Sequence, residues 1–400
     1  MTVAAGACLT VGVMPVFLVG SLSRSLGEDL GFGSAAAGTA VTFFFASSAL
    51  TAVVMGGVTD RVGSTLALRA GVTISATVMV LIALVASTWW HLAVFMAAGG
   101  AAIGLIDTGG ARSFSDSIRA ERHGVAFGIK EGSIPAASML AGLSIPLLTR
   151  HLGWGSAFLV AAALAPLVML LVPAGHATPD ADVDAVDEPH GSSTRDGAAA
   201  SRRTGGLVLF AVGVAAGSAA STSAATLFVP AVADRGWSED AAGVLLAVAS
   251  VGCIVVRVLL GWVSDRAAGT TWWLLGGALG CGAVGALLLA VTNQTVVVVA
   301  AAILLLGVGW GWSGLAFLSA VRARPDAPAL AAGIVLSGLA TGGAAGPAAF
   351  GILASTWSYQ GAWMAGAAAF VVAAALAVFT RSSYRPSQEP EPSPTRRGAD

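Results

Sequence analysis

The chain has 400 residues, of which 56% are hydrophobic and only 10% are charged, and its mean hydropathy is +0.83. Soluble domains carry about 25% charged residues, so this chain cannot cover a water-exposed surface of its own size. Its 20 basic and 21 acidic residues give a net charge of −1, which offers no basic excess for nucleic acid. The composition therefore excludes a soluble enzyme or a nucleic-acid binder and indicates a protein embedded in a lipid bilayer.

A helix needs about 20 mostly apolar residues to cross the hydrocarbon core of a membrane. Twelve runs satisfy this condition, at residues 3–22, 36–57, 65–87, 90–111, 125–149, 154–173, 206–231, 241–262, 271–291, 295–318, 329–355 and 360–380. The first run has no basic residue before it and eleven runs follow it, so we interpret it as a span and not as a cleaved signal peptide. The sequence predicts an all-α membrane protein with twelve transmembrane helices.

The basic residues orient these spans, because Lys and Arg concentrate in cytoplasmic loops. The loops after the even-numbered spans, taken with the C-terminal tail, hold 15 basic residues, whereas the opposite loops hold 3. An even number of spans places both termini on one side. We therefore predict cytoplasmic termini and a multi-pass monomer in the cytoplasmic (inner) membrane.

The chain divides into two related halves. Residues 174–205 are polar and acidic, which predicts a disordered cytoplasmic linker between an N-terminal half at 1–173 and a C-terminal half at 206–380. The tail at 381–400 is predicted to be disordered as well. With a constant offset of 205, GGVTDRVG at 56–63 aligns with GWVSDRAA at 261–268. Two repeated six-helix bundles are typical of transporters that expose a central site to each side in turn.

These two loop motifs resemble the loop motif of the major facilitator superfamily. They consist of Gly56, Asp60 and Arg61 after span two, and Gly261, Asp265 and Arg266 after span eight. The resemblance implies a twelve-span secondary transporter in which these loops form a gate. A carboxylate there can face the positive N-terminal end of a helix from the other half, so we predict that both aspartates latch the cytoplasmic side. The alternative is that the loops are tight turns that carry Arg only for orientation.

Charged residues inside spans cost roughly 2.5 to 3.5 kcal/mol each, so they usually face a cavity and have a function. Lys130, Glu131 and Arg257 are three such residues, in spans five and eight. The repeat aligns them with Val335, Leu336 and Ala52. The shared fold therefore does not require the charges. We predict one cluster in which Lys130 and Arg257 bind an anionic substrate and Glu131 is their counter-ion or a proton carrier. The alternative is a structural Glu131/Arg257 pair with Lys130 reaching towards the interface.

Further candidates lie in neighbouring spans. Asp107 in span four is a second candidate for proton coupling, with pairing to Arg112 at the helix end as the alternative. Trp310 and Trp312 in span ten are predicted to line the substrate cavity. Helix kinks are predicted at Pro135, Gly346 and Pro347.

The charges named for the cavity are net positive, with Lys130 and Arg257 against Glu131. We therefore predict that the substrate is a small organic anion and that protons are transported with it. Arg257 also resembles the span-eight arginine of monocarboxylate and oxalate transporters, and GIKEGS at 128–133 is similar to span five of cyanate and nitroimidazole-type permeases. The alternatives are a proton-driven exporter of hydrophobic cations and a membrane sensor or enzyme. The sequence has neither a nucleotide-binding loop nor a metal-ligand pattern. We therefore expect no enzymatic activity, cofactor or metal, and only a small-molecule substrate and lipid as partners.

Overall fold

The computed structural model describes residues 2–115, 123–172, 194–324 and 327–383. Within them, twelve helical segments are long and apolar enough to cross a membrane, which confirms the predicted number of spans. In the N-terminal half the helices are α1 (Thr2–Ser21), α2 (Ser23–Leu30), α3 (Ser34–Val62), α4 (Ser64–Val85), α5 (Trp89–Ser115), α6 (His123–Glu131), α7 (Ser133–Ser144), η2 (Ile145–Thr149), α8 (Arg150–Leu152) and α9 (Trp154–Leu171). The segments from α6 to α8 together form span five.

The C-terminal half repeats this arrangement. Its helices are α10 (Thr194–Ala233), α11 (Glu239–Arg266), η3 (Ala268–Thr270), α12 (Thr271–Val291), α13 (Thr295–Ala302), η4 (Ile303–Val308), η5 (Gly309–Trp312), α14 (Ser313–Ala323), α15 (Pro328–Thr356) and α16 (Tyr359–Ser383). The segments from α13 to α14 together form span ten. The prediction of an all-α protein with two repeated six-helix halves is confirmed.

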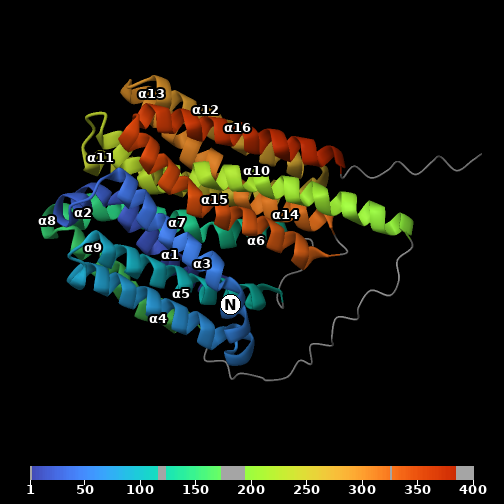
Figure 1. The fold of residues 1–400 in the computed structure, drawn as a ribbon, viewed down its shortest axis with the longest axis horizontal. Helices are drawn as coiled ribbons and strands as arrows, with labels where there is room; N and C mark the ends of the chain where they lie inside the picture. Colours follow the sequence, from blue (N-terminus) through green and yellow to red (C-terminus); the bar gives the residue numbers. More distant parts are fainter. Residues whose placement is uncertain (1, 116–122, 173–193, 325–326, 384–400) are drawn as a thin grey trace, which may run out of the picture.

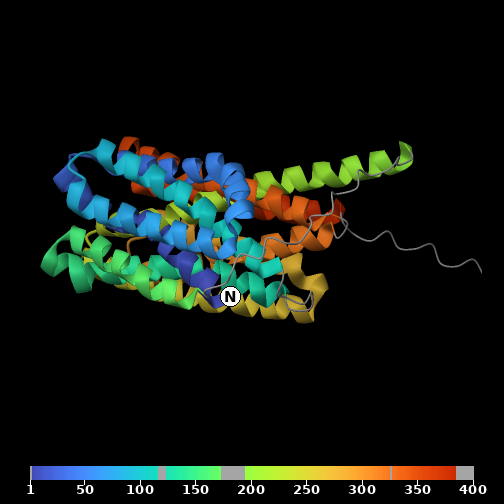
Figure 2. The same ribbon diagram turned by 90° about the horizontal axis from the view of Figure 1, so that it is seen from below.

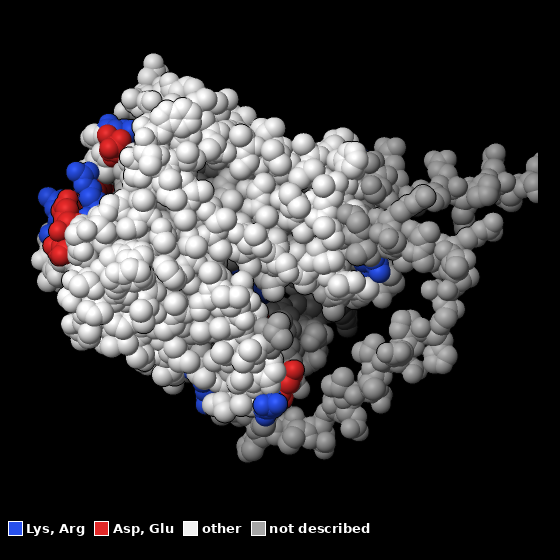
Figure 3. Space-filling view, in the orientation of Figure 1, with Lys and Arg blue, Asp and Glu red and all other residues white. Residues whose placement is uncertain are grey.

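The long helices run along one common direction, with α1 to α9 on one side and α10 to α16 on the other (Figure 1). A view from below shows the same common direction (Figure 2). We call the end at which α9 finishes and α10 begins the linker end, and the opposite end the far end. In the view of Figure 3, charged side chains gather towards these two ends and leave a broad uncharged band between them. Such a band is the surface that a hydrocarbon core requires.

Glycines allow the helices to pack closely within each half. On α15, Gly338, Gly342 and Gly346 recur every four residues and lie against the backbone of α10. A Cβ added to Gly338 would lie 2.6 Å from the carbonyl oxygen of Ala211. Small residues at this spacing let two backbones approach, which is how helices associate without a hydrophobic driving force. Gly346 therefore allows α15 to pack closely against α10. At the kinks predicted for Gly346 and Pro347, α15 is not interrupted and continues as one helix.

The boundaries of the predicted linker and tail differ from the structure. Residues 194–205 are helical and extend α10 beyond the predicted start of span seven. Alanines 198–200 and the two arginines at 202–203 favour a helix, and adding residues to an existing helix needs no new nucleation. At the other boundary α16 continues to Ser383. The rest of the predicted linker and tail lies outside the described residues.

Candidate functional site

A buried ion pair joins the two halves near the middle of the bundle. Nη1 of Arg257 on α11 lies 3.5 Å from Oε2 of Glu131 at the end of α6, and the two side chains are 1% and 6% exposed. Nη1 also donates a hydrogen bond to the backbone carbonyl of Glu131. This carbonyl is free to accept because Pro135, four residues later, has no N–H to offer it. The structure thus brings Glu131 and Arg257 together and interrupts span five at Gly132.

Span ten supplies further partners for this pair. Its backbone changes from a π-helix in η4 to a 3-10 helix in η5. The carbonyl oxygen of Trp310 accepts a hydrogen bond of 2.8 Å from Nη2 of Arg257, whose guanidinium carbon lies 5.5 Å from the centre of the indole ring. Ser313 donates its hydroxyl to Oε2 of Glu131 at 2.7 Å. Arg257 is therefore bound by oxygen atoms from both halves.

Lys130 and Asp107 form a looser pair beside the buried one. Lys130 Nζ lies 4.0 Å from Oδ1 of Asp107, and the two side chains are 20% and 34% exposed. This distance exceeds hydrogen-bond range, so the pair is held mainly by charge. The lysine nitrogen also lies 5.8 Å from the centre of the Phe317 ring. Asp107 thus has a partner on span five, and the side chain of Arg112 lies outside the described residues.

The four side chains change the charge balance inferred from the sequence. With all of them ionised, Lys130 and Arg257 are balanced by Asp107 and Glu131. The sequence count of a net positive cavity was wrong, because it left out Asp107. The cluster gains a net positive charge only when one of its carboxylates takes a proton.

The structure separates the two tryptophans of span ten. Trp310 lies in the cluster, but Trp312 is buried inside the C-terminal half, where a Cβ added to Gly217 of α10 would lie 3.1 Å from its Cζ2. Residues two apart on a 3-10 helix, which has three residues per turn, point in directions that differ by roughly 240°. The prediction that both rings line the cavity is therefore wrong for Trp312.

The molecular surface is hollowed between the two halves towards the linker end, and basic side-chain atoms are visible inside the hollow (Figure 3). At the far end the halves are held together by ion pairs. Arg24 on α2 lies 3.7 Å from Glu239, and Arg150 on α8 lies 3.0 Å from Asp240. Both acids stand in the first turn of α11, where the helix dipole also favours negative charge. The halves are thus joined at the far end, where a pocket lined by residues of both halves, Arg24 and Asp234 among them, remains beside the ion pairs.

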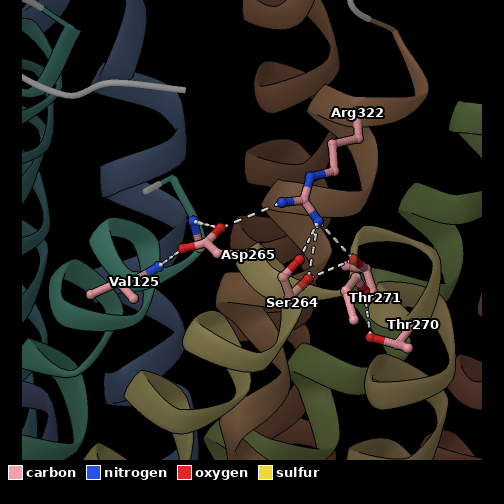
Figure 4. Close-up of polar contacts among 8 residues, drawn as sticks. Val125, Ser264, Asp265, Thr270, Thr271 and Arg322 are labelled. Carbon is pink, nitrogen blue, oxygen red and sulfur yellow. Dashed lines mark hydrogen bonds and ion pairs between the residues drawn. The ribbon is translucent and has the colours of Figure 1, made fainter. Parts of the chain in front are cut away.

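The second loop motif contacts the other half at the linker end (Figure 4). The carboxylate of Asp265 accepts hydrogen bonds from the backbone nitrogens of Gly124 at 2.8 Å and Val125 at 3.0 Å. These are the first turn of α6, so the carboxylate faces the positive end of a helix from the opposite half, as predicted from the motif. Beside it, Gly261 lies against the backbone of Gly124, where any added Cβ would clash.

Arg322 completes this contact and was missed by the sequence analysis. Its Nη2 lies 3.4 Å from Oδ1 of Asp265, and its Nη1 donates to Ser264 and Thr271 (Figure 4). In the sequence, Arg322 follows span ten. It served there only as one of the basic loop residues from which the orientation of the spans was predicted. Arg266, the arginine of the second loop motif itself, takes no part in this contact. Its guanidinium carbon lies 3.8 Å from the centre of the Trp262 ring.

The first loop motif has different surroundings. Asp60 and Arg61 are exposed at the end of α3. Among the described residues, the only atom within 4 Å of a Cβ added to Gly56 is a methyl carbon of Thr108, on α5 of the same half. The two motifs, equivalent in sequence, therefore occupy unequal positions, and Gly56 does not contact the other half.

Asp265→Asn is expected to lower the free energy of unfolding by about 1.5 to 3 kcal/mol, the usual value of hydrogen bonds to a charged group. Thermal unfolding of the detergent-solubilised protein measures this loss. Asp60→Asn is the matched control, because it makes the same chemical change at the exposed equivalent position. Equal losses in the two variants would contradict the unequal roles of the motifs.

The chain was compared with known proteins and structures. Its sequence matches the model of the Major Facilitator Superfamily over residues 3–326 and 209–399. The fold is similar to that of a bacterial homolog of the human lysosomal transporter Spinster, solved in an inward-facing and occupied conformation. That likeness has a TM-score of 0.66 and 16% sequence identity, and it covers 96% of this chain and 95% of the other. No curated protein matches the sequence. The loop motifs, the repeated halves and the sequence match together show that the chain belongs to the Major Facilitator Superfamily, whose members are transporters and not enzymes.

Proposed function

We propose that the chain moves a small organic anion across the cytoplasmic membrane by alternating access, together with protons. The proposal is carried by the loose, partly exposed pair of Lys130 and Asp107. A carboxylate that enters a cavity of low dielectric constant loses its hydration and needs a fixed positive partner. Lys130 can supply that partner as a point charge, because Asp107 holds it without a close hydrogen bond.

Proton coupling follows from the neutrality of the cluster. A proton on Asp107 removes the charge that balances Lys130, and the substrate carboxylate takes its place. The cluster then remains neutral while one proton and one monoanion cross together. Glu131 is less suited to this exchange, because Ser313 and Arg257 already hold its carboxylate. Arg257, the other predicted substrate-binding residue, is less available than Lys130, because its guanidinium is already bound to Glu131 and Trp310.

We place the linker end in the cytoplasm. The excess of basic residues in the loops at this end supports that orientation. The hollow then opens to the cytoplasm, and the ion pairs of α11 close the outer face. In this assignment the structure is an inward-facing state.

Uptake into proteoliposomes tests the proposed function. A panel of labelled mono- and dicarboxylates is offered with and without an inward proton gradient, and we expect at least one to accumulate only with the gradient. Lys130→Ala should reduce its uptake by about tenfold or more, since hydrogen bonds to charged groups contribute about 1.5 to 3 kcal/mol. Lys130→Arg should retain part of the uptake. Arg381→Ala, which removes a basic residue near the end of α16, away from the cluster and from the contacts between the halves, is the matched control and should leave uptake unchanged.

A proton-driven exporter of hydrophobic cations is the second candidate. It is favoured by Asp107, the most exposed charge of the cluster, and by the aromatic rings of Phe317 and Trp310, which lie near Lys130 and Arg257. The same vesicles distinguish the candidates. Exchange of a labelled lipophilic cation for protons, lost in Asp107→Asn and kept in Lys130→Ala, would replace the anion proposal.

A further inference from the structure

Besides the contacts of α1 with α10 and of α6 with span ten, the two halves meet along two seams that the sequence repeat makes equivalent. The α7–α11 seam is formed by α6, α7 and α8 with α11, and the α3–α15 seam by α3 with α15. The offset of 205 relates α11 to α3 and span five to α15. A symmetric rocking motion would open and close both seams together. The structure shows that they differ.

The α7–α11 seam is closed along its whole length. At the far end, a Cβ added to Gly142 would lie 2.5 Å from the carbonyl oxygen of Gly243. In the middle, a Cβ on Gly128 would lie 2.6 Å from the carbonyl oxygen of Arg257, and at the linker end Gly124 meets Gly261. The two residue numbers of each pair have the same sum. In antiparallel helices every step forward along one helix is matched by a step back along the other, so a constant sum means that the register does not change along the seam. Neither helix diverges from the other.

Charged groups fasten the same seam at three levels. Arg150 pairs with Asp240 at the far end, Glu131 with Arg257 in the middle, and Asp265 binds the first turn of α6 at the linker end. The middle pair is the most deeply buried of them, and its guanidinium also binds the backbone of span ten. Separating these helices in a bilayer would leave buried charges without partners, which is expensive.

The α3–α15 seam is closed only in its far half. There Thr42 donates a hydrogen bond of 2.5 Å to the carbonyl oxygen of Ala344. Gly38 meets the backbone of Pro347, and a Cβ on Gly351 would lie 2.5 Å from the carbonyl oxygen of Ser34. These contacts keep one register as well, so the helices are aligned to continue pairing towards the linker end.

In its linker half the α3–α15 seam is open. Gly333 is the repeat equivalent of Gly128, and no atom of the described residues lies within 4 Å of a Cβ added there. Gly57 on α3 has the same open surroundings, and neighbouring Gly56 contacts only its own half. The glycines that permit close approach are present on both helices, but the helices have separated.

We infer that the α7–α11 seam is a fixed hinge, fastened by the Glu131/Arg257 pair, and that access alternates by opening and closing the α3–α15 seam alone. On this inference Arg257 positions span ten and holds the halves together, and does not bind the substrate. Asp265 belongs to the hinge, whereas Asp60 belongs to the seam that opens. The two motifs of one repeat thereby acquire different functions.

Pairs of spin labels on the two seams test the inference. In a chain whose native cysteines are replaced by alanine, one pair is placed at Val54 and Leu330 across the linker half of the α3–α15 seam. The second pair is placed at Ile129 and Leu259 across the α7–α11 seam. All four side chains are exposed, so the labels do not disturb the packing. Double electron–electron resonance gives both distances in proteoliposomes.

Gly38→Trp forces the seam to change state, because the indole cannot fit against the backbone of Pro347 at the closed far end. The Val54/Leu330 distance is expected to shorten as the linker half closes, while the Ile129/Leu259 distance stays the same. Gly57→Trp is the matched control on the same helix, and its open surroundings should leave both distances unchanged. Thr42→Phe is a milder wedge at the same end, should the tryptophan variant not fold.

Lengthening of the Ile129/Leu259 distance in either wedge variant would show that both seams open, and the hinge would be wrong. Unchanged distances at both pairs, in a folded wedge variant, would equally overturn it. Neither result depends on the substrate, so failure of the anion proposal leaves this test intact.

Discussion

Arg257→Leu is expected to be the most destabilising single substitution in the cluster. It leaves Glu131 as an unpaired charge in a buried site, and breaking a buried pair in this way costs about 3 to 5 kcal/mol. It also removes the donor to the carbonyl of Trp310 and so releases the irregular segment of span ten. Unfolding by heat or denaturant, followed by circular dichroism in detergent, measures the loss.

Two further variants separate the cost of an unpaired buried charge from the cost of losing an arginine side chain. Glu131→Gln combined with Arg257→Leu removes both charges and is expected to recover most of the lost stability, because no uncompensated ion remains. Arg24→Leu removes an exposed arginine from the far end and should cost less than about 1 kcal/mol. An Arg257→Leu protein as stable as the unmodified chain would show that the pair does not fasten the halves.

Asp107→Asn is expected to abolish accumulation driven by a proton gradient while leaving exchange of the anion intact. One-to-one coupling to a pH difference of one unit supports about tenfold accumulation, which is about 1.4 kcal/mol. The asparagine cannot carry the proton, and its neutral amide leaves Lys130 permanently available to the substrate. Accumulation and counterflow of the carboxylate identified by uptake are measured in the same vesicles.

Glu28→Gln is the control for this substitution, because it neutralises an exposed acid outside the cluster. It should accumulate the anion as the unmodified chain does. If Asp107→Asn still concentrates the substrate tenfold, the proton is carried elsewhere. Glu131, the other carboxylate of the cluster, would then be the carrier to test.

The number of spans and the repeat were predictable because both depend on local composition and spacing. Apolar runs of sufficient length must be helices in a bilayer, and twelve of them were found. The meeting of Glu131 and Arg257 was also predicted, since both lie at a similar depth on spans of opposite halves. These features follow from helix geometry together with the family arrangement.

The charge of the cluster was not predicted, because the partner of Asp107 lies on another helix. Arg112, five residues away in the same span, was the alternative that sequence distance suggested, whereas the structure pairs the acid with Lys130. Arg322 was missed for the same reason. Its contact with Asp265 depends on how span ten packs against α11, and the sequence spacing of 57 residues does not encode that.

The helix interruptions had partial signals in the sequence. Pro135 indicated a kink, and the consequence that it frees the carbonyl of Glu131 for Arg257 could have been derived from its missing N–H. The separate directions of Trp310 and Trp312 were also derivable from helical spacing. The change from the π-helix η4 to the 3-10 helix η5 was not predicted; in the structure both segments pack against α11 and α12.

The unequal seams also bear on the origin of the chain. Two separate copies of a six-helix unit, related by a twofold axis, would have met along two identical seams. Every charge added to one seam would have appeared in the other. Here Lys130, Glu131 and Arg257 have only apolar equivalents across the repeat. A dimer of identical copies must place the same side chains in both seams, whereas the two halves of a single chain can carry different side chains at equivalent positions, and here they do.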